Sequence, residues 1–93
     1  MVNKNIIKIR KKLDILDNSF LKLIKKRTNL VNQVLKNKKF KKDIIDKKRI
    51  SIILKKISKK SKKNNIDPKI SVKIWTAMIR AYIEYEFRNF KKK

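Results

Sequence analysis

The chain has 93 residues and a formal net charge of +23, with 30 lysines and arginines against seven acids. It contains no Cys, His or Gly. This excludes disulfides, the usual zinc sites, Ser-His and Cys-His nucleophile pairs, and glycine-rich phosphate loops. The chain has a single Pro and its apolar residues recur at helical spacing, so we predict an all-α fold. A chain this short buries little core by itself, which favours an oligomer.

The first predicted helix runs from about Lys4 to Lys36 and organises the rest of the chain. Its apolar side chains recur at alternating steps of four and three and form a heptad seam of Ile9, Leu13, Leu16, Phe20, Leu23, Leu30 and Val34. Arg27 and Lys38 take positions of the seam where the pattern calls for apolar residues. A cation on such a face needs an anion opposite it, and acids are few. We therefore infer that this segment presents cations to an anionic ligand.

The length of this helix indicates a partner. At about 1.5 Å per residue it is roughly 50 Å long, too long for a compact monomer of this size. We expect it to pair with its own copy, so that the protein is a homodimer. Arg10 lies one turn from Asp14 and Asp17, and either forms a surface ion pair with them or contacts a ligand.

A polar, lysine-rich stretch at residues 36–43 is predicted to be a loop. The second helix follows from about Asp46 to Lys62, with Asp46 as a plausible N-cap. One face of this helix is apolar and consists of Ile50, Ile53, Leu54 and Ile57. Arg49 flanks this face in the first turn.

The third helix opens at Asp67-Pro68, in the favoured order of N-cap and then proline. Glu86 stands on its apolar face, among Val72, Trp75, Met78, Ile79, Tyr82 and Phe90. Two interpretations of Glu86 stay open. It forms a salt bridge to a core-facing cation such as Lys38 or Arg27, or it is a carboxyl group that burial keeps neutral and that donates a hydrogen bond.

The excess of lysine has two interpretations. A net charge of +23 suggests nucleic acid or an anionic membrane. Yet the lysines are spread over every predicted helix, and the aromatic residues lie mainly on core faces rather than among the cations. We interpret the lysines as a solvated surface typical of an AT-biased genome, and expect no nucleic-acid partner and no membrane partner. The chain lacks a membrane-spanning apolar run and a signal-peptide core, so we expect a cytoplasmic protein.

Arginine is informative in a chain that uses lysine so freely, because its planar fork binds carboxylates with two hydrogen bonds. The order and spacing of the charged positions resemble those of the all-helical chorismate mutases, over residues 6–90. The resemblance rests on Arg10, residues 13–17, Arg27, residues 34–38, residues 46–49 and Glu86. It implies an intertwined homodimer in which the long first helices pair and each active site draws on both subunits.

The resemblance also implies a role for each matching position. Arg10 would reach into the partner's active site and bind one carboxylate of the substrate. Arg27 would clamp the other carboxylate. Lys38 would contact the ether oxygen of the breaking bond and a carboxylate, and Glu86 would point at the same ether oxygen. We favour the neutral form of Glu86 there, because many relatives have Gln at this position.

Four further residues complete the candidate substrate site. Arg49 would help to hold a carboxylate, and Asp46 would contact the substrate hydroxyl through its backbone. Ile50 stands where the mutases usually have Glu, and Tyr82 where many have a small polar residue. These two departures and a shorter loop before Arg49 are similar to features of the isochorismate-pyruvate lyases, which share the fold.

The chemistry that the resemblance implies agrees with the composition. Chorismate is a dianion with an enol-pyruvyl ether, and its rearrangement to prephenate is pericyclic, so it needs no nucleophile, metal or cofactor. Positioning by arginine clamps and donors aimed at the ether oxygen would supply the catalysis. The leading interpretation is a single-domain chorismate mutase, residues 1–93, in aromatic amino-acid biosynthesis. The alternatives are an isochorismate-pyruvate lyase, a basic helical nucleic-acid-binding module, and a non-catalytic relative.

Overall fold

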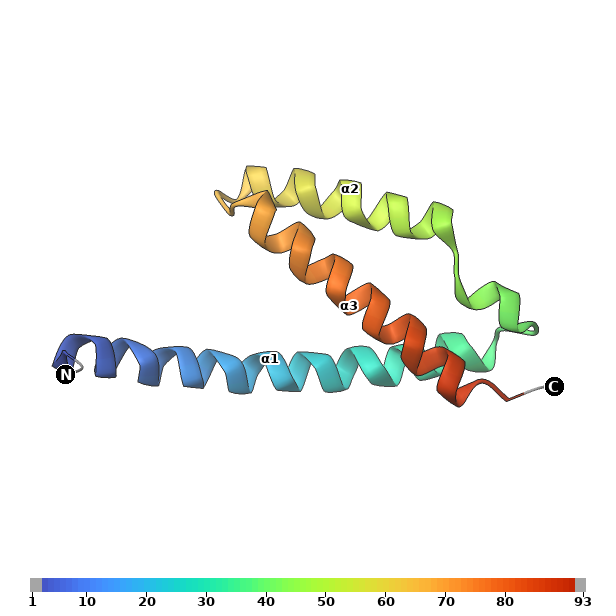
Figure 1. The fold of residues 1–93 in the computed structure, drawn as a ribbon, viewed down its shortest axis with the longest axis horizontal. Coiled ribbons are helices and arrows are strands. Elements are labelled where there is room, and N and C mark those ends of the chain that lie inside the picture. Colours follow the sequence, from blue (N-terminus) through green and yellow to red (C-terminus); the bar gives the residue numbers. More distant parts are fainter. Residues whose placement is uncertain (1–2, 92–93) are drawn as a thin grey trace. The chain divides into compact units, whose positions relative to one another are not determined.

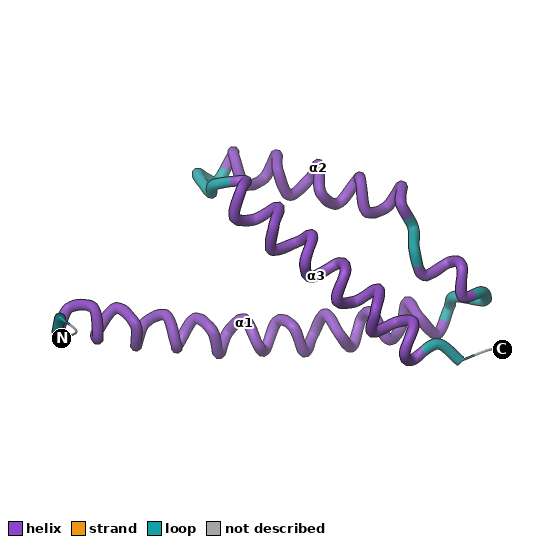
Figure 2. The backbone as a smooth tube through the Cα atoms, in the orientation of Figure 1, coloured by secondary structure: helices purple, strands orange, loops and turns teal. Residues whose placement is uncertain are grey.

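The computed structural model describes residues 3–91, and most of these residues are helical (Figures 1 and 2). The elements in chain order are α1 (Lys4–Lys36), the short 3-10 helix η1 (Lys41–Ile44), α2 (Lys47–Lys63) and α3 (Pro68–Asn89). No strand occurs among residues 3–91. The prediction of an all-α fold with three main helices is confirmed, and so are their boundaries to within a residue or two.

Two details between α1 and α2 differ from the sequence predictions. The stretch predicted as a loop contains η1, in which the Asp43 amide donates to the Phe40 carbonyl at 3.0 Å and the Asp43 carboxylate accepts from the Phe40 amide at 3.2 Å. Lys38 also lies two residues beyond the end of α1, so a turn presents it rather than the helix. In that turn the Lys38 amide donates to the carbonyl of Leu35 at 3.1 Å.

The chain divides into two compact units, residues 1–33 and 34–93, and each is described by itself. The first unit holds most of α1, a helix of 33 residues and roughly 50 Å in length. No residue that the structure describes in this unit is buried. The seam side chains are all more than half exposed, namely Ile9, Leu13, Leu16, Phe20, Leu23 and Leu30. The chain by itself therefore leaves the apolar face of α1 open.

The second unit is built on a hairpin of α2 and α3, which lie side by side in antiparallel directions (Figure 1). The side chains that helical spacing predicted to face the core are half-buried: Ile50, Ile53, Leu54 and Ile57 on α2, and Val72, Trp75, Met78, Ile79 and Tyr82 on α3. The opposite face of α2 is exposed and carries Lys48, Lys55, Lys56, Lys59, Lys62 and Lys63. Among residues 3–91, no helix is both long enough and apolar enough to cross a membrane.

Side-chain caps fix both ends of the hairpin's helices. Asp46 caps α2, since its carboxylate accepts from the amide of Arg49 at 3.0 Å. Asp67 caps α3, since its carboxylate accepts from the amide of Lys69 at 2.9 Å, and Pro68 follows at the first helical position. These caps satisfy amide groups that have no partner within the helix.

The turn between α2 and α3 is closed by asparagine in a chain without glycine. Asn65 has a φ of +58°, in the left-handed region. The amide of Ile66 donates to the carbonyl of Ser61 at 2.8 Å, and that of Asn65 to Lys62 at 3.3 Å. This is the hydrogen-bond pattern of a Schellman motif, in which Asn is the usual substitute for Gly.

Below this turn, two serine hydroxyls meet where the helices approach each other. Ser61 and Ser71 are 4% and 8% exposed, and their Oγ atoms are hydrogen-bonded to each other. The Ser61 hydroxyl is also bonded to the carbonyl of Ile57 at 2.6 Å. Because both hydroxyls have partners, burying them carries no penalty for an unmade hydrogen bond. The contact joins the two helices at the closed end of the hairpin.

We predict that Asn65→Ala lowers the free energy of unfolding by about 1 kcal/mol, because alanine lacks the short polar side chain that offsets the steric cost of a β-carbon in the left-handed conformation. Asn65→Gly is the matched control and is expected to unfold at the same urea concentration as the parent or a higher one. Equal destabilisation by both variants, measured by urea unfolding, would mean that the asparagine side chain and not its backbone conformation supports the turn.

Candidate functional site

A partly buried ion pair in the second unit joins Lys38 to Glu86. The Lys38 Nζ donates to Glu86 Oε1 at 2.9 Å. Glu86 lies in the last turns of α3 and is 7% exposed, and the Lys38 side chain is 19% exposed. Of residues 3–91, these two form the one ion pair within 4.0 Å. The structure therefore brings together the two residues that were predicted to face the reacting ether oxygen.

This contact is the one that the first of the two interpretations of Glu86 described, a salt bridge to Lys38. Glu86 accepts a hydrogen bond from a cation, so the salt bridge is what the structure shows. The neutral carboxylic acid that we favoured stays a prediction. A buried carboxylate and a partly buried ammonium each need the other, because burial without an opposite charge is costly.

Half of the other six acids serve the backbone. Three of the seven, namely Asp43, Asp46 and Asp67, accept hydrogen bonds from backbone amides at the starts of helical segments. Among residues 3–91, Glu86 is thus the acid that faces a cation, and that cation is Lys38. The pairing is selective, since 30 lysines and arginines are available.

Asp46 and Arg49 lie together in the first turn of α2. The cap joins the two residues, since the Asp46 carboxylate accepts from the backbone amide of Arg49. The Arg49 side chain is exposed, and within the described residues no acid lies within 4.0 Å of its guanidinium. Arg49 is therefore free to bind an external carboxylate with its planar fork.

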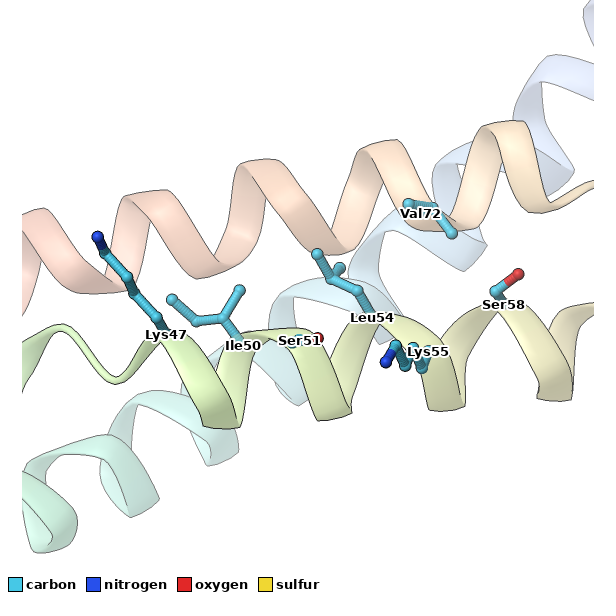
Figure 3. A pocket seen from close by; sticks show the side chains of 7 residues that line it. All are labelled: Lys47, Ile50, Ser51, Leu54, Lys55, Ser58 and Val72. Carbon is cyan, nitrogen blue, oxygen red and sulfur yellow. The ribbon is translucent and has the colours of Figure 1, made fainter.

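Ile50 lies in a shallow groove along α2 that the sequence did not reveal. The groove has a volume of about 550 Å³ and is lined by Lys47, Ile50, Ser51, Leu54, Lys55, Ser58 and Val72. In Figure 3, Ile50 and Leu54 rise from α2 toward α3, from which Val72 approaches. Ser58 follows Leu54 by one turn on the same face of α2. This helical spacing was the feature of the sequence that could have indicated that Ser58 lines the groove. Where Ile50 lines the groove, the groove wall is apolar.

Tyr82 is half-buried on α3, one turn before Glu86. Its ring meets that of Tyr85 edge to face, with the ring centroids 6.3 Å apart. Such a contact fixes the orientation of an aromatic ring. Because Tyr82 lies one turn before Glu86, it is at the same end of α3 as the ion pair.

Arg10 and Arg27 belong to the first unit, and both side chains are exposed on α1. In the described part of the chain, no ion pair within 4.0 Å joins Arg10 to Asp14 or Asp17, so the surface pair that we considered is not formed. Both guanidinium groups are available to an anion. The residues described here also hold no cluster of three or more potential metal-binding His, Cys, Asp or Glu side chains.

Residues 9–87 match the family model described as "Chorismate mutase type II". The chain belongs to the chorismate mutase type II family. All candidate site residues, from Arg10 to Glu86, lie inside the matched range of the chorismate mutase model. No curated protein and no solved structure gives a significant match to this chain.

We predict that the Lys38–Glu86 pair contributes to stability through both charges. Lys38→Met leaves a buried carboxylate without a cation and should lower the free energy of unfolding by about 1 to 3 kcal/mol. Glu86→Met should do the same, and the double variant should recover part of the loss. Urea unfolding of all four proteins at neutral pH gives the coupling energy. Strictly additive losses would show that the two side chains do not interact in solution.

Proposed function

We propose that this protein is a chorismate mutase that rearranges chorismate to prephenate. The family match supports the class of reaction. The single observation that carries the proposal is the Lys38–Glu86 pair at 2.9 Å, which sets an ammonium and a carboxyl group side by side at a partly buried position. The chemistry needs a hydrogen-bond donor at such a place, because negative charge develops on the ether oxygen as its bond to the ring breaks.

In this proposal Lys38 donates to the ether oxygen in the transition state. A preorganised donor of this kind is typically worth about 3 kcal/mol, a factor of a hundred or more in rate. The new carbon–carbon bond forms while the carbon–oxygen bond breaks, so no group on the enzyme needs to attack or to carry away an atom. The residues act by position and charge alone.

Arginine side chains would fold the substrate into the reactive conformation. Arg27 would bind one carboxylate and Arg10, supplied by the other subunit, the second. Arg49 would assist at a carboxylate, and Asp46 would contact the ring hydroxyl through its backbone. What supports these roles is that all three guanidinium groups are exposed and that none is paired with an acid of the described chain. Holding a flexible dianion in a near-attack geometry is worth several kcal/mol.

We also propose that the active protein is a homodimer in which the α1 helices pair. The support is the exposed seam of α1, whose apolar side chains are more than half exposed in the single chain. A helix with such a stripe gains stability when a partner covers it. The same pairing would deliver Arg10 to the other subunit's site.

A second candidate is the isochorismate-pyruvate lyase reaction, which gives salicylate and pyruvate. The observation that favours it is Ile50, an apolar side chain in the α2 groove. A carboxylate at this position would accept a hydrogen bond from the substrate hydroxyl, and isoleucine cannot. Both reactions use the same clamps and the same donor to the ether oxygen, so the two proposals differ in substrate and product.

Product identification separates the candidates. We expect the purified protein to convert chorismate to prephenate. The test is to incubate the protein separately with chorismate and with isochorismate and to identify the products by liquid chromatography. Salicylate and pyruvate from isochorismate, without prephenate from chorismate, would replace the mutase by the lyase. Turnover of neither substrate would contradict both.

Arg27→Ala should lower kcat/KM for chorismate at least a hundredfold, because it leaves a substrate carboxylate without its partner in the site. Lys26→Ala is the matched control, since it removes the same charge from the neighbouring exposed position of α1. It should keep kcat/KM within about threefold of the parent. Equal losses in the two variants would indicate a general effect of charge, and near-normal turnover in Arg27→Ala would place the site elsewhere.

A further inference from the structure

Two hollows of the second unit share a lysine. The α2 groove, of about 550 Å³, has on one edge the polar side chains of Lys47, Ser51, Lys55 and Ser58. In Figure 3 these residues follow one another along α2, with Lys47 at one end and Ser58 at the other. A second hollow, of about 390 Å³, is lined by Lys42, Asp43, Ile45, Asp46 and Lys47. Because Lys47 lines both, the two hollows form one track from η1 along the edge of α2, which we call the α2 track.

The cations of the α2 track have no acid of the chain to neutralise them. Among residues 3–91, no ion pair within 4.0 Å involves Lys42, Lys47 or Lys55. The two acids of the second hollow serve the backbone, since the carboxylates of Asp43 and Asp46 accept from amides at helix starts. The helix α2 itself contains no acid. The track is therefore a concave surface of positive charge, which attracts a ligand with several negative charges.

The spacing along the edge of α2 fits a ligand with repeated charges. Lys47, Ser51, Lys55 and Ser58 are separated by steps of four, four and three residues, and so lie on one side of the helix. At about 1.5 Å per residue this row is roughly 16 Å long, about five nucleotides at the 3.4 Å rise of a stacked strand. Lysine and serine side chains both donate to phosphate oxygens. A row of donors matches a phosphate backbone better than it matches a small dianion.

The α2 track also offers surfaces for bases. Its floor in the groove is apolar and consists of Ile50, Leu54 and Val72. At the η1 end, Phe40 is 59% exposed, and the Nζ of Lys42 lies 5.4 Å from the centroid of its ring. An exposed aromatic ring beside a cation is a platform on which a base stacks. Bases are free to stack on a protein in a single strand, whereas a duplex keeps them stacked on one another.

We propose that the α2 track binds a single strand of nucleic acid without preference for sequence. The phosphates contact Lys42, Lys47 and Lys55, and a base stacks on Phe40. This inference goes beyond the proposed function and does not depend on it. It replaces the expectation of no nucleic-acid partner, which rested on evenly spread lysines and on aromatic side chains in the core. In the track, lysines line a hollow and the aromatic residue is exposed.

The shape of the track favours this ligand over an anionic membrane. A helix that binds at a bilayer surface buries its apolar face among the lipids. The apolar face of α2 is half-buried against α3 instead. Lys47 and Lys55 also line a hollow, which a strand can enter and a flat bilayer surface cannot fill.

Fluorescence anisotropy tests the proposal with the whole 93-residue chain. The probes are labelled oligouridylate and oligothymidylate of about 12 nucleotides, titrated at several NaCl concentrations between about 50 and 200 mM. We expect both strands to bind with an affinity that falls as salt rises, and more tightly than a duplex of the same length. Tighter binding of oligouridylate would identify RNA as the ligand, and tighter binding of oligothymidylate would identify DNA.

Replacing the three lysines of the track should change the response to salt. Each phosphate contact to a single strand adds about 0.7 to the slope of log affinity against log salt concentration. The triple variant Lys42→Gln, Lys47→Gln and Lys55→Gln should therefore have a slope that is less steep by about two. Its affinity at low salt should fall by at least about tenfold.

The matched control removes the same charge from α2 outside the track. Lys56, Lys60 and Lys63 are exposed and line neither hollow. Their triple replacement by Gln should change the slope by less than half as much. Equal effects of the two triple variants would overturn the proposal, because they would show attraction by the overall charge rather than by the track.

Phe40 provides a readout that charge alone does not move. Phe40→Ala should weaken binding of the single strands by about tenfold and leave binding of the duplex unchanged, whereas Phe40→Trp should retain binding of the single strands. The exposed position of the side chain makes loss of folding an unsuitable explanation. No effect of Phe40→Ala, or duplex binding as tight as that of the single strands, would overturn the proposal. Binding to phosphatidylserine vesicles without binding to either strand would overturn it in favour of a membrane.

Discussion

The Lys38–Glu86 ion pair is the constraint on which the site depends. It joins the turn after α1 to the last turns of α3, two segments that lie 48 residues apart in the sequence. The pair forms at the open end of the α2–α3 hairpin, whereas the hydroxyls of Ser61 and Ser71 join the closed end. Apolar faces determine which sides of α2 and α3 approach each other. The charged contact determines which polar groups meet once they have done so.

Helix identity followed from local chemistry and was predicted well. The caps at Asp46 and Asp67 are short-range contacts that reach two or three residues along the chain, so composition and spacing are enough to locate them. The burial of Glu86 was likewise visible from its place in the apolar face of α3. The same reasoning extended the seam to Lys38, which lies beyond the helix end, because spacing does not report where the backbone leaves helical geometry.

Other features depend on contacts that spacing cannot report. The 3-10 helix at Lys41–Ile44 rests on hydrogen bonds between Phe40 and Asp43 within a stretch without apolar periodicity. The partner of Glu86 could be narrowed to a core-facing cation but not to one residue, since that choice is made in three dimensions. The roles of Arg10 and Arg27 toward the substrate stay predictions, because both residues lie in the first compact unit, whereas Lys38 and Glu86 lie in the second.

The lysine face of α2 has a consequence for the response of the protein to salt. Six lysines share this exposed face, and α2 contains no acid that could offset them. Their mutual repulsion opposes folding, and mobile counter-ions screen it over a Debye length of about 8 Å at physiological ionic strength. Rising ionic strength therefore favours the folded chain while it weakens the attraction of any dianion. Folding and ligand capture respond to salt with opposite signs.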